Sequence, residues 1–125
     1  MQRTLGLSVL ASIIFLYIVY LQSVIVSPKM GIAEADFEVF GRVQGVFFRK
    51  HTQLQAENLG VRGWCMNTRD GTVKGHIEGP PETLPMMMIW LERQGSPSSK
   101  IEKVIFSGQR TKLEYDFTNF EIRTE

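Results

Sequence analysis

A loop that holds two glycines and ends on an arginine carries the chemistry that stands out most in this chain. It runs from Gly41 to Arg49, between a segment that alternates like a strand and one that suits a helix. The first N–H groups of a helix have no partner within it, and the helix dipole favours negative charge there. Gly45 lets the main chain approach an anion, and Arg49 adds a planar cation for two phosphate oxygens. The loop therefore predicts a small phosphate-binding site.

This loop differs from the nucleotide-binding P-loop. No Gly-Lys-Ser/Thr follows it, and the Gly-x-Gly-x-x-Gly spacing is absent. A second candidate, Asn67, stands near the end of a predicted strand. A carboxamide cannot act as a base, but it can hold a water molecule through its oxygen and its N–H groups. Taken singly, Asn67 is typical of a turn and Arg49 of an exposed first helical turn, so the site depends on their pairing.

The overall composition indicates one ordinary globular domain. The chain has 125 residues and a formal net charge of +1, which gives no reason to expect a nucleic-acid partner. Cys65 is the single cysteine, so an intrachain disulfide is impossible, and we interpret it as a small buried apolar residue rather than a nucleophile. The two histidines lie far apart, and no Cys/His cluster has the spacing of metal ligands.

The composition changes sharply near residue 30. The 22 residues from Leu5 to Val26 carry no charge, and about 20 apolar residues in a helix are enough to cross a membrane. We therefore predict a single N-terminal membrane segment at residues 5–26, with the rest of the chain in the cytoplasm. A cleaved secretory signal and an internal start at Met30 are the alternatives. The predicted organisation is a hydrophobic segment with a linker at residues 1–30 and a globular domain at residues 31–125.

Hydrophobic spacing predicts five strands and two helices in that domain. The predicted strands cover residues 35–39, 61–68, 72–79, 100–108 and, as a short strand, 117–122. The predicted helices cover residues 48–59 and 84–94. The order β-α-β-β-α-β, plus a short fifth strand, predicts an α+β, ferredoxin-like split βαβ fold with both helices on one face of an antiparallel sheet. In this topology the second strand pairs with the third, and the third neighbours the first. Asn67 would then approach the loop that holds Arg49.

Two stretches resemble the signatures of the acylphosphatase family. The first is Val39 to Arg49, which matches without a departure, and the second is Gly63 to Asn67 with Gly71, Val73 and Gly79 behind it. The resemblance covers residues 35–123. It implies a ferredoxin-like enzyme that hydrolyses the carboxyl–phosphate bond of acyl phosphates without a metal or other cofactor, and releases a carboxylate and inorganic phosphate. The apolar segment before Met30 has no counterpart in the family pattern.

The resemblance also implies roles for single residues. Arg49 would bind the phosphoryl group, and Asn67 would position the attacking water. The loop N–H groups that would cradle the phosphate oxygens belong to Gln44, Gly45, Val46, Phe47 and Phe48. The expected substrates are small acyl phosphates, with aspartyl phosphates of membrane ATPases as a further class, and the domain is expected to be monomeric. An acyl phosphate already carries a good leaving group, so catalysis reduces to positioning water and stabilising charge.

Two functions of other classes compete with this interpretation. A non-catalytic module for binding anions or protein partners could keep the same fold, although its signature residues would then have no evident use. RNA-recognition domains share the topology but need exposed aromatic residues on the sheet. Here Phe47 and Phe48 fall in the loop and at the helix start, and residues 31–125 carry 12 basic against 13 acidic side chains. We therefore expect no nucleic-acid partner.

Overall fold

The computed structural model describes residues 2–25 and 31–124. The chain divides into two compact units, Met1–Met30 and Gly31–Glu125, and each is described by itself. The first unit contains one helix, α1 (Gln2–Ile25). The predicted linker falls largely on residues 26–30, which lie outside the described residues.

The predicted membrane segment at residues 5–26 is wrong. Within the described residues, none of the helices is both long enough and apolar enough to cross a membrane. The prediction rested on the absence of charge over 22 residues, which does not by itself show that a helix crosses a membrane. The predicted membrane location and cytoplasmic orientation, which rested on this segment, are withdrawn with it.

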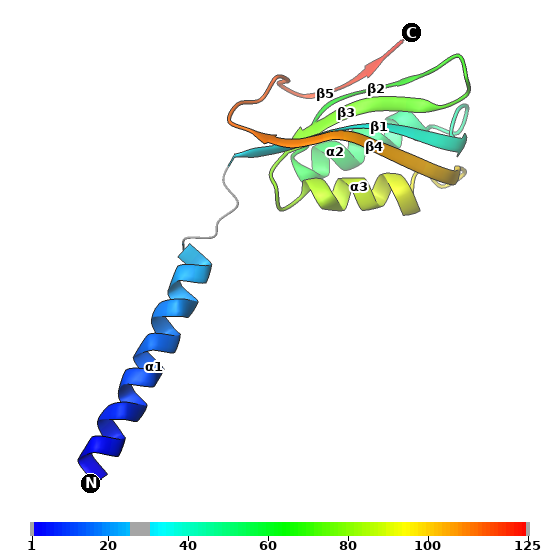
Figure 1. The fold of residues 1–125 in the computed structure, drawn as a ribbon. Helices are drawn as coiled ribbons and strands as arrows, with labels where there is room; N and C mark the ends of the chain where they lie inside the picture. Colours follow the sequence, from blue (N-terminus) through cyan, green and yellow to red (C-terminus); the bar gives the residue numbers. More distant parts are fainter. Residues whose placement is uncertain (1, 26–30, 125) are drawn as a thin grey trace. The chain divides into compact units, whose positions relative to one another are not determined.

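The second unit alternates strands and helices in the predicted order. Its elements are β1 (Ile32–Arg42), α2 (Phe48–Leu59), β2 (Arg62–Asn67), β3 (Val73–Gly79), α3 (Leu84–Arg93), β4 (Lys100–Lys112) and β5 (Phe120–Arg123). The strands form one sheet in the order β4-β1-β3-β2-β5, and α2 and α3 lie on the same face of it (Figure 1). The predicted ferredoxin-like split βαβ fold is confirmed. The sheet is mixed rather than purely antiparallel, because β5 runs parallel to β2.

The core lies between the sheet and the two helices. Along β1, Ala35, Phe37 and Val39 are buried, as the period-two pattern predicts. From α2 come three further buried side chains, Phe48, Thr52 and Ala56. From α3 come Leu84, Met87, Trp90 and Leu91. The rings of Phe48 and Trp90 meet with their centroids 5.8 Å apart, so the start of α2 is anchored to α3.

The residues that flank α2 explain where the helix begins and ends. Gly60 follows its last residue with φ 68°, and its N–H bonds back to the carbonyls of Ala56 and Glu57, which is the left-handed C-terminal cap that glycine favours. At the other end, Phe47 precedes the helix with φ 58°, an unusual conformation for a large side chain. The direction in which α2 leaves the loop, and with it the position of Arg49, is therefore fixed at both ends.

Candidate active site

A cavity of about 340 Å³ opens where the loop after β1 leads into α2. The loop, the first turn of α2, the end of β2 and the edge strand β5 all contribute to its walls. The lining residues are Val43, Gly45, Phe47, Phe48, Arg49, Lys50, Asn67 and Ile122. Arg49 and Asn67, which lie 18 positions apart in the chain, thus line one shared cavity. The strand order explains this, because β3 joins β2 to β1 and places the end of β2 beside the loop.

Arg49 lies in the first turn of α2 and is half-buried. Among the residues that the structure describes, none makes a hydrogen bond or an ion pair with its guanidinium. A guanidinium presents five N–H donors in a rigid plane that matches phosphate oxygens. The cavity therefore contains a cation whose donors are available to an anion.

Asn67 is the last residue of β2 and is paired with Val73 of β3. Its Oδ1 atom is buried and has no hydrogen-bond partner within the described part of the chain. A buried acceptor without a partner is rare and costs free energy. Its position in the cavity wall marks a place where a bound water or a ligand would supply the missing donor.

The N–H groups of the loop are also unengaged. From residue 44 to residue 48, no N–H donates to another described residue in a turn, loop or cap. Gly45 adopts φ 74°, and a Cβ built there would meet nothing within 4 Å. Position 45 therefore favours glycine because of its backbone conformation, and not because a side chain would collide with neighbouring atoms. Gly45, Phe47 and Phe48 line the cavity, whereas Gln44 and Val46 do not.

The side chain of Gln44 holds the loop against the turn between β2 and β3. Its Nε2 donates to the carbonyls of Thr68 and Thr72 at 2.8 and 2.9 Å. Thr72 in turn donates from its hydroxyl to Glu38 Oε2 on β1 at 2.6 Å. These bonds connect the loop to the chain immediately after Asn67, so the two halves of the site are held to each other. The sequence carries no local signal for this contact, because Gln44 lies 24 and 28 positions before the two residues that it contacts.

Cys65 is fully buried, and its Sγ lies 3.9 Å from the carbonyl oxygen of Arg49. Burial raises the pKa of its thiol to about 12, an effect that the nearby positive charge of Arg49 opposes only in part. The thiol is therefore protonated at neutral pH and is no nucleophile. This agrees with its interpretation as a small apolar core residue.

Comparison with known proteins identifies the family of this domain. A model of the acylphosphatase family matches residues 35–122, which is more than half of the chain. This chain belongs to the acylphosphatase family. The family and fold predicted from the two signatures are therefore confirmed.

Curated relatives and solved structures agree with the family match. Acylphosphatase-1 of Drosophila melanogaster is 56% identical over 90 residues, covering 72% of this chain and 75% of the relative. Acylphosphatase-2 of Homo sapiens is 44% identical over 97 residues, covering 78% and 98%. The crystal structure of acylphosphatase from Bacillus subtilis superposes with a TM-score of 0.67 at 33% identity, covering 73% and 98%. The prediction that this chain is an acylphosphatase, a hydrolase that acts on acyl phosphates, is confirmed.

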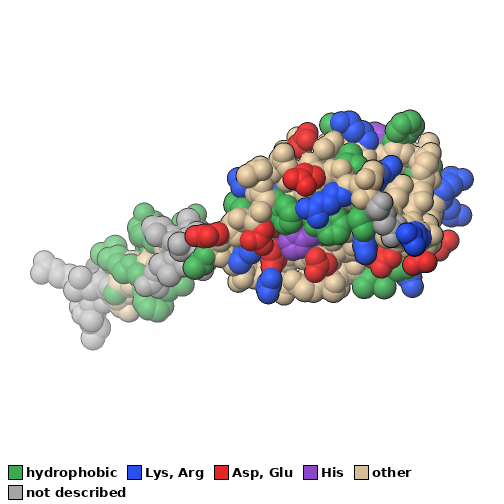
Figure 2. Space-filling model, turned by 90° about the horizontal axis from the view of Figure 1, so that it is seen from above, with side chains coloured by type: hydrophobic (Ala, Val, Ile, Leu, Met, Phe, Trp, Pro, Cys, Tyr) green, Lys and Arg blue, Asp and Glu red, His purple; other side chains and the backbone are tan. Residues whose placement is uncertain are grey.

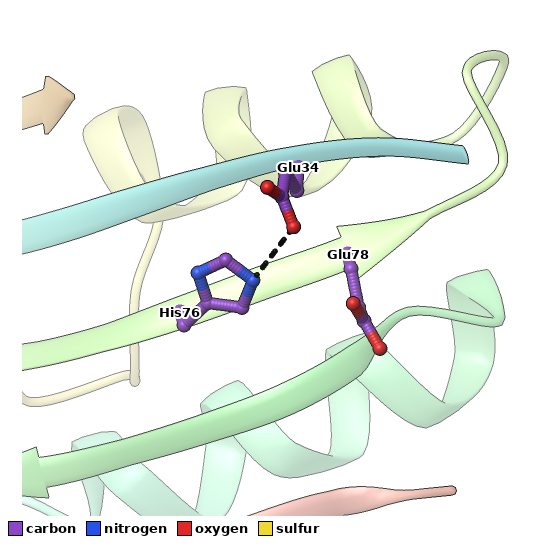
Figure 3. Close-up of side chains that lie close together, drawn as sticks. All are labelled: Glu34, His76 and Glu78. Atoms are coloured by element: carbon purple, nitrogen blue, oxygen red, sulfur yellow. Dashed lines mark ion pairs between the residues drawn. The ribbon is translucent and has the colours of Figure 1, made fainter. Parts of the chain in front are cut away.

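The face of this acylphosphatase domain opposite the helices carries a cluster of charged side chains. Figure 2 shows a histidine among acidic and basic side chains on this side. Glu34 projects from β1 toward His76 of β3, and Glu78 lies two residues further along β3 (Figure 3). The Nε2 atom of His76 is 3.3 Å from Glu34 Oε2, and its Nδ1 is 2.8 Å from Asp36 Oδ1.

Glu34, His76 and Glu78 could together hold a metal ion, since their potential ligand atoms lie within 4.8 Å of one another. The ammonium group of Lys112 already occupies this cluster, however. It forms ion pairs with Glu34, Glu78 and Asp116. Glu78 also accepts hydrogen bonds from the N–H groups of Asp116 and Phe117. The buried carboxylates are thus compensated by protein groups, and we interpret the cluster as the attachment of the 113–119 segment to the sheet.

We expect replacement of Glu34 by glutamine to lower stability by about 2–3 kcal/mol at neutral pH. Burial opposes ionisation of Glu34, but hydrogen bonds and charges from Lys112 and Arg110 outweigh it and lower its pKa from 4.5 to about 2. A folded-state pKa below the unfolded value stabilises the fold above the unfolded pKa, and that contribution is lost as pH falls from 4.5 toward 2. Thermal unfolding at neutral pH measures the first effect, and thermal unfolding between pH 4.5 and pH 2 measures the second.

The matched control is Glu102→Gln, which removes an exposed carboxylate that lies on β4 and outside the charged cluster. Its melting temperature should follow that of the unchanged protein at every pH. Glu34→Gln should start lower at neutral pH and lose less stability than the unchanged protein between pH 4.5 and 2. Parallel acid-unfolding profiles for the unchanged protein and Glu34→Gln would show that Glu34 carries no such linkage.

Proposed function

We propose that residues 31–125 form the catalytic domain and hydrolyse small acyl phosphates without a metal ion. The observation that carries the proposal is the shared cavity, whose walls include Arg49, with its unpaired guanidinium, and Asn67, with its unpaired Oδ1. A cation, free backbone N–H groups and a carboxamide acceptor are what the hydrolysis of a doubly charged phosphoryl group requires. A buried carboxamide oxygen with a purely structural role would normally have a hydrogen-bond partner.

The phosphoryl group binds at the loop. Arg49 donates two hydrogen bonds to its oxygens, and N–H groups of the 44–48 loop, above all those of Gly45, Phe47 and Phe48 that line the cavity, donate to the remaining ones. These donors are in place before the substrate arrives, so they stabilise the charge that develops on the equatorial oxygens without reorganising. The α2 dipole adds positive potential at the same point.

Asn67 positions the nucleophile. Its Oδ1 accepts a hydrogen bond from a water molecule, and the water oxygen then attacks phosphorus as the bond to the acyl oxygen breaks. The departing carboxylate is a weak base, so it requires no proton from a general acid. A phosphoryl oxygen receives the proton of the attacking water, and the products are a carboxylate and inorganic phosphate. The rate gain comes from orientation and electrostatic stabilisation alone.

Two finer statements extend this proposal. Aspartyl phosphates of membrane ATPases contain the same carboxyl–phosphate bond and stay a predicted substrate class, supported by that chemistry alone. The domain is proposed to act as a monomer, because every residue assigned to the site belongs to one chain. Both statements are separate from the assignment of Arg49 and Asn67.

The test is turnover of benzoyl phosphate by the full chain, followed as release of inorganic phosphate. We expect the same rate with excess EDTA as with added magnesium, because the protein groups supply all the positive charge. A rate that collapses in EDTA and returns with magnesium would contradict the metal-free mechanism. Binding of phosphate without any turnover of benzoyl phosphate would instead favour a non-catalytic anion-binding module.

A further inference from the structure

Phe47 combines two features that a large side chain normally avoids. Its backbone has φ 58°, and it is the one residue other than glycine with positive φ in the described part of the chain. For a bulky residue this conformation is strained. Its ring is also 78% exposed, so packing within the protein does not compensate for that strain. An exposed aromatic ring held in a strained position at the mouth of a cavity indicates a binding role.

A second apolar residue, Ile122, reaches the same cavity from the edge of the sheet. It lies on β5 in parallel register with Cys65, two positions before Asn67 along the neighbouring strand. Its side chain is 37% exposed and lines the cavity with Phe47. A charged residue would be tolerated at this position of an edge strand, because its neighbours Glu121 and Arg123 are both charged and exposed. The cavity therefore has an apolar part beside its phosphate-binding part.

The cavity is larger than a phosphoryl group requires. A phosphoryl group with its bridging oxygen has five heavy atoms, and if each took the volume of a water molecule, about 30 Å³, together they would fill roughly 150 Å³. More than half of the cavity of about 340 Å³ would then remain for the rest of the substrate. Lys50 also borders this space, but its ammonium is directed to Gln53 Oε1 at 3.3 Å. The remaining space is thus bordered mainly by carbon.

We propose that Phe47 and Ile122 form the binding site for the acyl group and select acyl phosphates whose acyl group is apolar, above all aromatic. This inference rests on the proposed function, because it places the phosphoryl group at Arg49 and the loop. A flat apolar acyl group would cover the exposed Phe47 ring and the Ile122 side chain, and the water released from these surfaces would favour binding. A short acyl group such as acetyl would leave both side chains in water.

The test compares kcat/KM for benzoyl phosphate with kcat/KM for acetyl phosphate in the full chain. We expect Ile122→Ala and Phe47→Gly each to lower the benzoyl-to-acetyl ratio by about tenfold, the usual scale for losing apolar contact in a binding pocket. Ile105→Ala is the matched control, because Ile105 is a 50% exposed isoleucine on β4 outside this cavity. Its ratio should equal that of the unchanged protein.

Phe47→Gly separates binding from folding. Glycine adopts positive φ without strain, and the lost ring is largely exposed, so the melting temperature should be equal or higher. A lower ratio at equal or higher melting temperature supports the acyl site. Ratios that match the unchanged protein in both variants overturn it, while the proposed function survives. If the unchanged protein hydrolyses neither substrate, the proposed function itself fails.

Discussion

Replacement of Arg49 by glutamine is expected to lower kcat/KM for benzoyl phosphate by at least about 10³-fold. Glutamine keeps a polar side chain of similar reach but loses the positive charge and the planar fork of donors. Because no other described group binds the guanidinium, its removal leaves no partner unsatisfied in the free protein. The loss should therefore appear in catalysis and phosphate binding, with little change in melting temperature.

Arg93→Gln is the matched control, since Arg93 is exposed in the last turn of α3 and lies outside the cavity. It should retain full activity. Inhibition by inorganic phosphate gives an independent readout, because the product occupies the same cradle, and Arg49→Gln should weaken it. If Arg49→Gln kept the activity of Arg93→Gln, the phosphoryl group would have to bind elsewhere.

The fold could be predicted because its local signals agree with one another. The bounds of α2 were predicted correctly, since the loop precedes it and Gly60 closes it. β4 was the main error, because Gly108 was interpreted as the end of the strand. Gly108 in fact has φ 59° at an irregularity in the β1–β4 pairing, where Glu34 pairs with Arg110 and Asp36 with Ser107. A glycine with positive φ is equally compatible with a bulge and a strand end.

That error concealed the charged cluster. The four residues of β4 beyond Gly108 bring Arg110 and Lys112 to Glu34 and Glu78. The alternation in the two strands gives no sign that Glu34 and Glu78 are buried, yet both are. Glu78 also accepts hydrogen bonds from the 113–119 segment, whose course no local pattern specifies.

The candidate site was predictable in part. The loop, the helix start and Arg49 form one continuous stretch, so their chemistry can be read locally, and the topology brings Asn67 to them. The contributions of Gln44 and Ile122 could not be read in this way. Gln44 acts through its side chain on the turn after β2, and Ile122 arrives on a short strand that pairs in parallel. Parallel pairing of a four-residue strand leaves no signature in its own sequence.

Replacement of Asn67 by alanine is expected to lower kcat by about 10²–10³-fold while KM changes little. The carboxamide acts on the water and not on the phosphoryl group, so substrate binding through Arg49 and the loop should persist. Inhibition by inorganic phosphate should therefore be nearly unchanged, unlike that of Arg49→Gln. This division between kcat and binding distinguishes a residue that positions water from one that holds phosphate.

Stability provides the complementary measurement. The Oδ1 atom of Asn67 is buried without a partner, so its removal relieves an unsatisfied acceptor and leaves none behind. Asn67→Ala should consequently melt at the same temperature as the unchanged protein or above it, and so should Asn58→Ala, an exposed control on α2. A variant that keeps its fold and its phosphate affinity but loses turnover would assign Asn67 to the water. A large fall in melting temperature, or unchanged kcat, would instead make Asn67 a structural residue at the end of β2.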